Sequence, residues 1–109
     1  MVSHPRQDEI WLVPLDPSMG SEIRKTRPCL VISPDEMNEP LRTVVVAPMT
    51  SARRNYRSRV NLRFRNKTGQ VALDQMRAVD RQRMVRRLGV ISPRTAEEVS
   101  RVLVEMFAR

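Results

Sequence analysis

The chain has 109 residues, 40% of them hydrophobic, and 20 Lys or Arg against 12 Asp or Glu give a formal net charge of +8. This length supports one hydrophobic core and excludes two independent domains, and no apolar stretch approaches the length of a membrane span. The positive charge favours a polyanion as partner, with an acidic protein segment as the second choice.

Residues 1–8 are expected to form a short flexible leader. They contain no hydrophobic targeting segment, so we expect a cytoplasmic protein without membrane contact. His4, the only histidine, lies in this leader. A nuclease that moves protons with paired histidines and a histidine-ligated zinc site are therefore both excluded.

Two apolar runs, residues 10–15 and 29–32, are predicted to form strands buried on both faces. Cys29, the only cysteine, lies in the second run and is predicted to be a core residue, which excludes an internal disulfide and a cysteine metal cage. The loop between the runs carries Glu22, Arg24, Lys25 and Arg27. Charged groups held at fixed positions between two core strands are typical of a functional site. A solvated hairpin tip without a function explains them equally well.

A third predicted strand, residues 43–48, ends at Thr50 and Ser51, whose hydroxyls often only satisfy nearby backbone groups. A basic run follows, and within it the apolar residues of positions 60–64 alternate with polar and cationic ones. This alternation predicts a strand with one cationic face. Such a face either deters edge pairing or forms an electrostatic track for phosphates.

The sequence predicts a turn at residues 66–69 and a returning strand over 70–79, with Val71, Leu73 and Met76 inward. Asp80 is predicted to cap a short helical turn that Gly89 ends. Ser92-Pro93 opens a last helix over 93–108. Its apolar face is predicted to comprise Ala96, Val99, Val102, Leu103, Met106 and Phe107.

These elements predict one domain, mainly β, in which a small antiparallel barrel (residues 9–79) precedes the short helical turn (80–89) and the C-terminal packing helix. From the residues alone, the function extends no further than a basic β-barrel that binds an anionic partner. No cofactor and no metal are implied by the sequence.

Three blocks carry a more specific pattern: IWLVPLDPSMGSEIRKTRPCLVIS, VVVAPMTS and GQVALDQMRAVDRQRMVRRLG. In this order and spacing they resemble the MazF/PemK (Kid) family of toxin endoribonucleases from type II toxin–antitoxin systems. The resemblance implies an SH3-like barrel with a C-terminal helix that acts as a homodimer. It also implies an mRNA interferase, which cleaves single-stranded RNA at selected sequences without a metal, and an acidic MazE-like antitoxin as partner.

The family motif also implies site residues. The Gly-Ser-Glu loop and the Arg-Pro pair correspond to Gly20, Ser21, Glu22 and Arg27, and the threonine that ends the third strand corresponds to Thr50. We expect Arg27, Thr50 and Glu22 to be catalytic. The expected RNA-binding residues are Ser21, Arg24, Lys25, Ser51, Arg53, Arg54, Gln75 and Arg77.

Chemistry constrains the catalytic roles. The RNA 2′-hydroxyl is the nucleophile, so cleavage gives a 2′,3′-cyclic phosphate and a 5′-hydroxyl, and DNA should bind without being cut. Arg27 suits the phosphate because its planar fork matches two oxygens, and Thr50 can donate to the same group. Glu22 either orients Arg27 or accepts a proton, and we expect the orienting role because a normal carboxylate is a weak base at neutral pH. Alternatively, the two form an ordinary surface ion pair.

Two other functions stay open at this point. One is a CcdB-like toxin that binds DNA gyrase and performs no chemistry, which would not need a loop directed at phosphate. The other is a non-catalytic nucleic-acid-binding barrel, which the composition alone favours and which would bind RNA in a salt-sensitive way without forming product.

Overall fold

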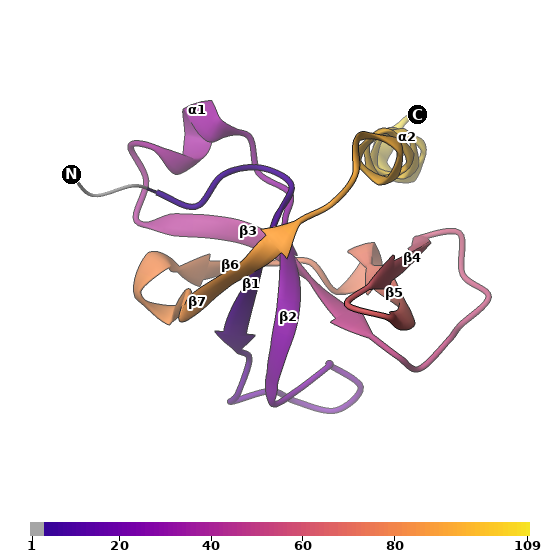
Figure 1. Cartoon of the computed structure of the whole chain (residues 1–109), viewed down its shortest axis with the longest axis horizontal. Helices are drawn as coiled ribbons and strands as arrows, with labels where there is room; N and C mark the ends of the chain where they lie inside the picture. Colours follow the sequence, from indigo (N-terminus) through magenta and orange to yellow (C-terminus); the bar gives the residue numbers. More distant parts are fainter. Residues whose placement is uncertain (1–3) are drawn as a thin grey trace.

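Apolar and β-branched runs form strands in the computed structural model, which describes residues 4–109 (Figure 1). The strands are β1 (Glu9–Pro14), β2 (Thr26–Val31), β3 (Thr43–Thr50), β4 (Arg59–Phe64), β5 (Lys67–Ala72), β6 (Arg77–Asp80) and β7 (Arg86–Val90). The α-helices are α1 (Asp35–Asn38) and α2 (Pro93–Phe107), and two 3-10 helices are η1 (Leu73–Gln75) and η2 (Arg81–Arg83). In the described part of the chain, no helix is both long and apolar enough to cross a membrane.

The strands form one curled antiparallel sheet with the order β4-β5-β3-β2-β1-β7, and β6 also pairs with β3. The two halves of β3 have different neighbours on one edge: Thr43 lies opposite Asp80 of β6, whereas Thr50 lies opposite Gln70 of β5. The η1 turn separates β5 from β6 and lets the sheet curl at this point. The predicted small barrel with a C-terminal helix is confirmed.

Both faces of the central strands are buried, as the continuous apolar runs predict. Along β2, Leu30 contributes to one core cluster, whereas Cys29 and Val31 contribute to the other. In β1, Ile10 and Val13 divide between the two clusters in the same way. Because side chains alternate across a strand, each central strand stabilises two cores at once.

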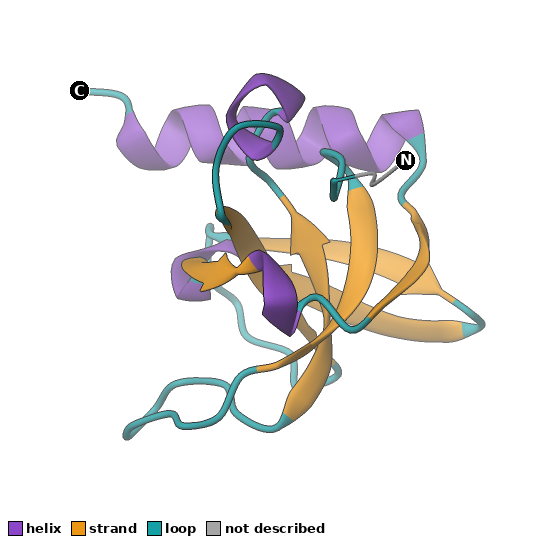
Figure 2. Ribbon diagram, turned by 90° about the vertical axis from the view of Figure 1, so that its left-hand side faces the viewer, coloured by secondary structure: helices purple, strands orange, loops and turns teal. Residues whose placement is uncertain are grey.

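Helix α2 covers the first core cluster and lies across one side of the sheet, whereas the long β1–β2 loop projects from the opposite side (Figure 2). The helix begins as predicted, because the Ser92 hydroxyl accepts a hydrogen bond from the Thr95 N–H at 3.2 Å and Pro93 occupies the first turn. Val99 and Val102 are buried. Phe107 was predicted on the same face, but it is 66% exposed because it lies in the last turn, beyond the edge of the core.

Four predicted element boundaries are wrong. The second strand begins at Thr26, three residues earlier than predicted, so Arg27 belongs to β2 and not to the loop before it. The turn lies at Arg65 and Asn66, which both have positive φ angles, so the strand resumes at Lys67. The strand predicted over 70–79 is interrupted by η1. The helical turn predicted over 80–89 ends at Arg83, after the predicted Asp80 cap, and residues 86–90 form β7 because β1 offers them a free edge.

The predicted leader is also partly wrong. Residues 1–3 lie outside the described residues. In the described remainder, the Gln7 N–H donates to the Asp35 carboxylate at 2.8 Å, and the Asp8 N–H donates to the Val31 carbonyl at 2.9 Å. Residues 7 and 8 are therefore held against the end of β2.

Gly69 of β5 sets how closely this strand approaches the end of β3. A Cβ at position 69 would lie 2.8 Å from the Thr50 carbonyl oxygen, a backbone atom that cannot move without moving β3. We therefore expect Gly69→Ala to lower the free energy of unfolding by about 1–3 kcal/mol in urea denaturation. Thr68→Ala, an exposed change in the same strand, is the control; equal stability of the two variants would contradict this packing.

Candidate active site

Arg27 and Thr50 lie on neighbouring strands and line the same cleft. Cys29 of β2 lies opposite Pro48 of β3, and the same register continued by two residues brings Arg27 level with Thr50. The first cleft has a volume of about 340 Å³. It is lined by Arg27, Pro28, Met49, Thr50, Ser51, Leu62, Phe64, Arg65, Lys67, Thr68, Gly69 and Leu88.

The Arg27 guanidinium is held by one hydrogen bond. Its Nε–H donates to the carbonyl of Arg24 at 3.0 Å, which fixes the plane of the group from the side of the β1–β2 loop. Within residues 4–109, neither terminal nitrogen of Arg27 has an acceptor. The fork that matches a phosphate is therefore available at the cleft.

The Thr50 hydroxyl is used in part by the backbone. Its Oγ1 accepts a hydrogen bond from the Ala52 N–H at 3.1 Å, as expected for a hydroxyl at a strand end. This bond uses an acceptor position and leaves the hydroxyl proton free to donate. Ser51 follows on the exposed rim of the first cleft.

A second cleft, of about 410 Å³, lies on the other side of Thr50. Arg59 connects two of its lining residues: the guanidinium donates to both Asp74 oxygens, at 2.7 and 3.3 Å, and is 5.1 Å from the centre of the Tyr56 ring. The Tyr56 ring is 53% exposed. The second cleft is lined by Ser21, Ile23, Thr50, Ala52, Arg54, Tyr56, Arg59, Asp74 and Gln75.

The Asp74 carboxylate is held in its charged form. Partial burial raises its pKa, but hydrogen bonds from Arg59 and Ser58 outweigh burial and leave the pKa below its usual value. Asp74 therefore anchors Arg59 beneath the second cleft. Its side chain is 28% exposed, so the ion pair remains at the surface of the cleft.

Glu22 does not meet Arg27. Its Oε1 accepts the Met19 N–H at 2.5 Å, within the same loop, and the Glu22 N–H donates to the Met19 carbonyl at 3.0 Å. Glu22 lines neither cleft. In the described part of the chain, no ion pair forms between Glu22 and Arg27, and the Arg24 carbonyl orients the guanidinium instead.

Gln75 and Arg77 face the backbone of the β1–β2 loop. The Gln75 amide accepts the Ile23 N–H at 2.9 Å and donates to the Ser21 carbonyl at 3.2 Å. Arg77 donates to the Ile23 carbonyl at 3.2 Å and weakly to the Leu15 carbonyl at 3.4 Å. Both side chains, expected to bind RNA, are already occupied by the protein.

The remaining expected RNA-binding residues lie on the two loops beside the clefts. Arg24 donates to the Gly20 carbonyl at 3.1 Å, and Lys25 has a φ of 73° at the point where the loop joins β2. Arg53 and Arg54 are exposed after β3, and Arg54 donates to the Arg53 carbonyl at 2.9 Å. The structure thus brings Arg27, Thr50 and Ser51 to one cleft and Ser21, Arg54 and Gln75 to the other.

Sequence reasoning did not include Tyr56, Arg59, Arg65 or Lys67 among the site residues. Arg59 was signalled by the cationic alternation of β4, and Arg65 and Lys67 by the basic run that continues beyond this strand. The Arg65 guanidinium bridges to β7 by donating to the Leu88 carbonyl at 2.7 Å. No local pattern pointed to Tyr56, because its place beside the clefts depends on the β3–β4 connection.

Other chemistries have little support in this set of residues. Cys29 is fully buried, and burial raises the pKa of its thiol to about 12, so a thiolate nucleophile is excluded at neutral pH. Within residues 4–109, no three His, Cys, Asp or Glu side chains gather as metal ligands. The site offers a guanidinium fork, a hydroxyl donor and an anchored carboxylate.

Comparison with protein families gives a match over residues 6–107 to PemK-like, MazF-like toxins of type II toxin–antitoxin systems. Endoribonuclease PemK of Escherichia coli is 38% identical over 86 residues, which are 72% of this chain and 62% of PemK. The chain thus spans about three fifths of the length of that relative. Endoribonuclease MazF9 of Mycobacterium tuberculosis is 33% identical over 80% of this chain and 82% of MazF9.

Solved structures give the same result for the fold. MazF from Deinococcus radiodurans superimposes with a TM-score of 0.84 at 25% identity, over 99% of this chain and all of that one. The MazE–MazF complex from the same organism contains a chain that superimposes with a TM-score of 0.78 at 22% identity, over 98% of both chains.

The anchored Asp74 generates a prediction for the pH dependence of stability. Because its folded pKa lies below the usual 3.8, the carboxylate stabilises the fold above that pH, and this contribution is lost as the pH falls further. Asp74→Asn should therefore have a lower free energy of unfolding than the parent near neutral pH. This difference in free energy, the stability gap, should narrow below pH 3.8. Urea denaturation across this range measures the gap, with Asp16→Asn, an exposed carboxylate, as control; a gap independent of pH would contradict the ion pair.

Proposed function

Since the chain belongs to the family of PemK-like, MazF-like toxins, as the three sequence blocks predicted, we propose that it is a toxin endoribonuclease that cleaves single-stranded RNA. The relatives named above are endoribonucleases, which favours this activity over gyrase binding and over a barrel without catalysis. We place its action in the cytoplasm, where messenger RNA is translated.

The convergence of Arg27 and Thr50 on the first cleft carries this proposal. A phosphodiester in this cleft would face the unpaired terminal nitrogens of Arg27 and the free hydroxyl proton of Thr50. Arg65 and Lys67 lie on the rim of the same cleft and attract the flanking phosphates. A domain that only bound gyrase would have no use for two phosphate donors set side by side.

The reaction requires no external nucleophile. The RNA 2′-oxygen attacks the adjacent phosphorus, the bond from phosphorus to the 5′-oxygen breaks, and the products are a 2′,3′-cyclic phosphate and a 5′-hydroxyl. One proton leaves the 2′-hydroxyl and one reaches the 5′-oxygen, so charge balances. Arg27 and Thr50 stabilise the charge that develops on the phosphorane oxygens, and this stabilisation by fixed donors lowers the barrier. No step uses a metal or cofactor.

The geometry does not carry the expected catalytic role of Glu22, because this side chain lines neither cleft and does not contact Arg27. Of the two roles that the sequence left open, orientation of Arg27 is already supplied by the Arg24 carbonyl. The other role, acceptance of the 2′-hydroxyl proton, would require the β1–β2 loop to bring Glu22 to the first cleft, whereas here its Oε1 accepts the Met19 N–H.

The RNA is proposed to run across both clefts. Ser51 would contact the RNA next to Thr50 in the first cleft. Ser21, Arg24 and Lys25 would contact the RNA from the β1–β2 loop. Arg53 and Arg54 add positive charge beside the second cleft. The exposed ring of Tyr56 offers a surface for one base, as single-stranded RNA binding commonly requires. Selection of a cleavage sequence would follow from the shape of these two loops.

We also propose two protein partners. The D. radiodurans relative forms a MazE–MazF complex, and an acidic MazE-like antitoxin would gain from the +8 charge of this chain. Its flexible acidic segment would lie over the cationic loops and block the clefts. A second copy of the chain would complete a homodimer, the state that the family resemblance implies.

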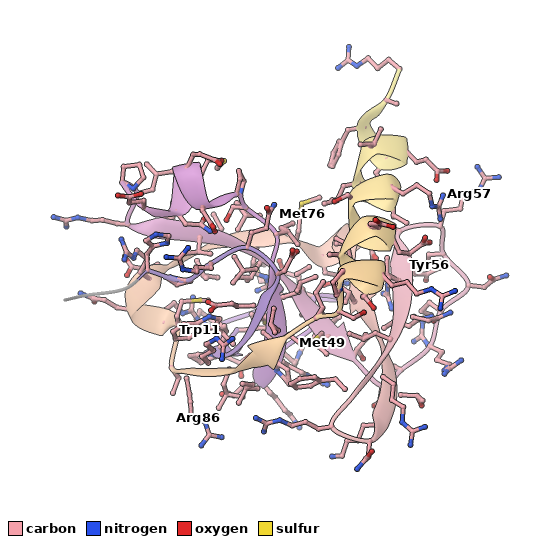
Figure 3. The ribbon with its side chains drawn as sticks, turned by 45° about the horizontal axis from the view of Figure 1, so that its top comes forward. Trp11, Met49, Tyr56, Arg57, Met76 and Arg86 are labelled. Atoms are coloured by element: carbon pink, nitrogen blue, oxygen red, sulfur yellow. The ribbon has the colours of Figure 1, made fainter. Side chains whose placement is uncertain are left out.

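The activity is tested by incubating a long single-stranded RNA with the purified protein in EDTA. We expect cleavage at discrete sites with 2′,3′-cyclic phosphate ends and no cleavage of a matched DNA. Arg27→Ala should reduce kcat/KM by about 100-fold or more, because the main phosphate donor is lost. Arg86→Ala, which removes a charge that projects away from the sheet, should stay near the parent (Figure 3).

Three outcomes would count against the proposal. Absence of RNA cleavage by a folded protein that still binds RNA would favour the non-catalytic barrel and make gyrase binding the next assay. Cleavage of DNA in EDTA would exclude the 2′-hydroxyl as the only nucleophile. Full activity of Arg27→Ala would remove Arg27 from the chemistry.

The docking of the antitoxin is tested by neutralising Arg53, Arg54 and Arg57 together as glutamines. These three residues are exposed on the β3–β4 connection, so their loss should weaken inhibition by an acidic MazE-like antitoxin by about tenfold or more. The inhibition constant is measured on a short RNA at low ionic strength. Arg42, Arg86 and Arg94, changed together, form a control with equal charge loss elsewhere on the surface; unchanged inhibition in the test variant would place the antitoxin on another face.

A further inference from the structure

We propose that Gln75 and Arg77 are positioning residues that orient Arg27 through the backbone of the β1–β2 loop and do not bind RNA. The inference deepens the proposed function and rests on it for the role of Arg27. It differs from the sequence expectation, which placed both side chains among the RNA contacts. It is carried by hydrogen bonds from η1 and β6 to Ile23 and by the hydrogen bond between the Arg24 carbonyl and Arg27, which the backbone from Ile23 to Arg24 connects.

The series begins at Ile23, which is held from both sides. Its N–H donates to the Gln75 Oε1 at 2.9 Å, and its carbonyl accepts from the Arg77 Nη2 at 3.2 Å. With the N–H and the carbonyl of one loop residue both fixed, the two peptide planes that meet at Ile23 have little freedom to rotate. The side chain of Ile23 packs against the second core cluster and restricts this residue further.

The peptide after Ile23 leads directly to the catalytic side chain. Its nitrogen belongs to Arg24, and the next carbonyl, that of Arg24, accepts the Arg27 Nε–H at 3.0 Å. A rotation at Ile23 would therefore move the acceptor that fixes the plane of the Arg27 guanidinium. Phosphate recognition by this group is bidentate, so it depends on that plane.

The start of the same loop is held from the neighbouring segment. Arg83, at the end of η2, donates to the carbonyls of Pro14 and Asp16, both at 2.6 Å. The Ser18 hydroxyl donates to the Leu15 carbonyl at 2.9 Å, and the Leu15 N–H donates to the Lys25 carbonyl at 2.9 Å. Both arms of the loop are therefore fixed to the framework, and its tip alone projects.

RNA contact by the same two side chains would require these bonds to break. Gln75 uses both its oxygen and its nitrogen on the loop, and Arg77 is half-buried beneath it. Exchange of these satisfied bonds for bonds to RNA would leave the Ile23 N–H and carbonyl without partners. Arg24, Lys25 and Arg53 lie at the surface without that cost and are the better phosphate contacts.

The test compares Arg77→Ala and Gln75→Met with Arg86→Ala as the control for loss of a charge. Each variant is first shown to unfold cooperatively in urea. Three quantities are then measured: kcat and KM on a short RNA, the Kd for the same RNA with a 2′-deoxy sugar at the scissile position, and hydrogen exchange at the Ile23 amide without RNA.

We expect kcat to fall by about 10- to 100-fold in both test variants, as small displacements of a catalytic group commonly cost. The Kd for the uncleavable RNA should change by less than about threefold, since the lost side chains do not touch it. The Ile23 amide should exchange faster in Gln75→Met, because its acceptor is gone. Arg77→Lys should recover part of kcat, since one donor still reaches the Ile23 carbonyl.

The opposite result, weaker RNA binding with an unchanged kcat, would overturn the inference. A rise in the Kd by tenfold or more with kcat unchanged would make both residues RNA contacts, as would a lower salt dependence of binding in Arg77→Ala. Unchanged exchange at Ile23 in Gln75→Met would also overturn it. The exchange measurement needs no catalysis, so it separates failure of this inference from failure of the proposed function, which would appear as absence of cleavage by the parent protein.

Discussion

The pairing of β2 with β3 is the constraint on which the rest of the molecule depends. Both strands are buried on both faces, so a shift of their register by one residue would exchange the side chains of the two core clusters. Two residues beyond the last pair of this register, Cys29 with Pro48, Arg27 and Thr50 line the same cleft. The hydrophobic effect therefore restricts the relative position of Arg27 and Thr50, although neither residue belongs to the core itself. A site built at the ends of two such strands is rigid without needing a metal or an ion pair to hold it.

The positive charge of the chain serves two different purposes. Some arginines support the fold: Arg59 is held by Asp74, and Arg77 and Arg83 donate to backbone carbonyls of the β1–β2 loop. Others, such as Arg53 and Arg63, are exposed. The net charge of +8 identifies a polyanion as partner but does not show which arginines meet it. Arginine suits the role of holding a loop, because one planar guanidinium can donate to two backbone carbonyls. Such carbonyls lack the hydrogen bonds that a neighbouring strand would supply.

Much of the fold could be predicted from the sequence because its signals are local. The apolar runs of β1 to β3, the alternation in β4 and the Ser92-Pro93 start of α2 each reflect the environment of a single element. β7 was missed because Arg86 and Arg87 have no strand pattern, and the free edge of β1 that pairs with them is set by tertiary structure. For the site, the family motif placed Arg27 and Thr50 together. It could not show that Gln75 and Arg77 face the loop, since those contacts join residues more than 50 positions apart.

The β1–β2 loop is held in place by hydrogen bonds to its backbone, although loops are usually more mobile than strands. A loop leaves backbone N–H and carbonyl groups without the partners that a strand would supply, and each such group must find another or remain solvated. Here Gln75, Arg77 and Arg83 supply those partners from one adjoining segment, η1 to η2. The two arms of the loop are thus fixed to the framework, and one of them accepts the Arg27 Nε–H, whereas at the tip Met19 is 81% exposed. In this arrangement the tip could change in sequence without disturbing the hydrogen bonds that hold the two arms.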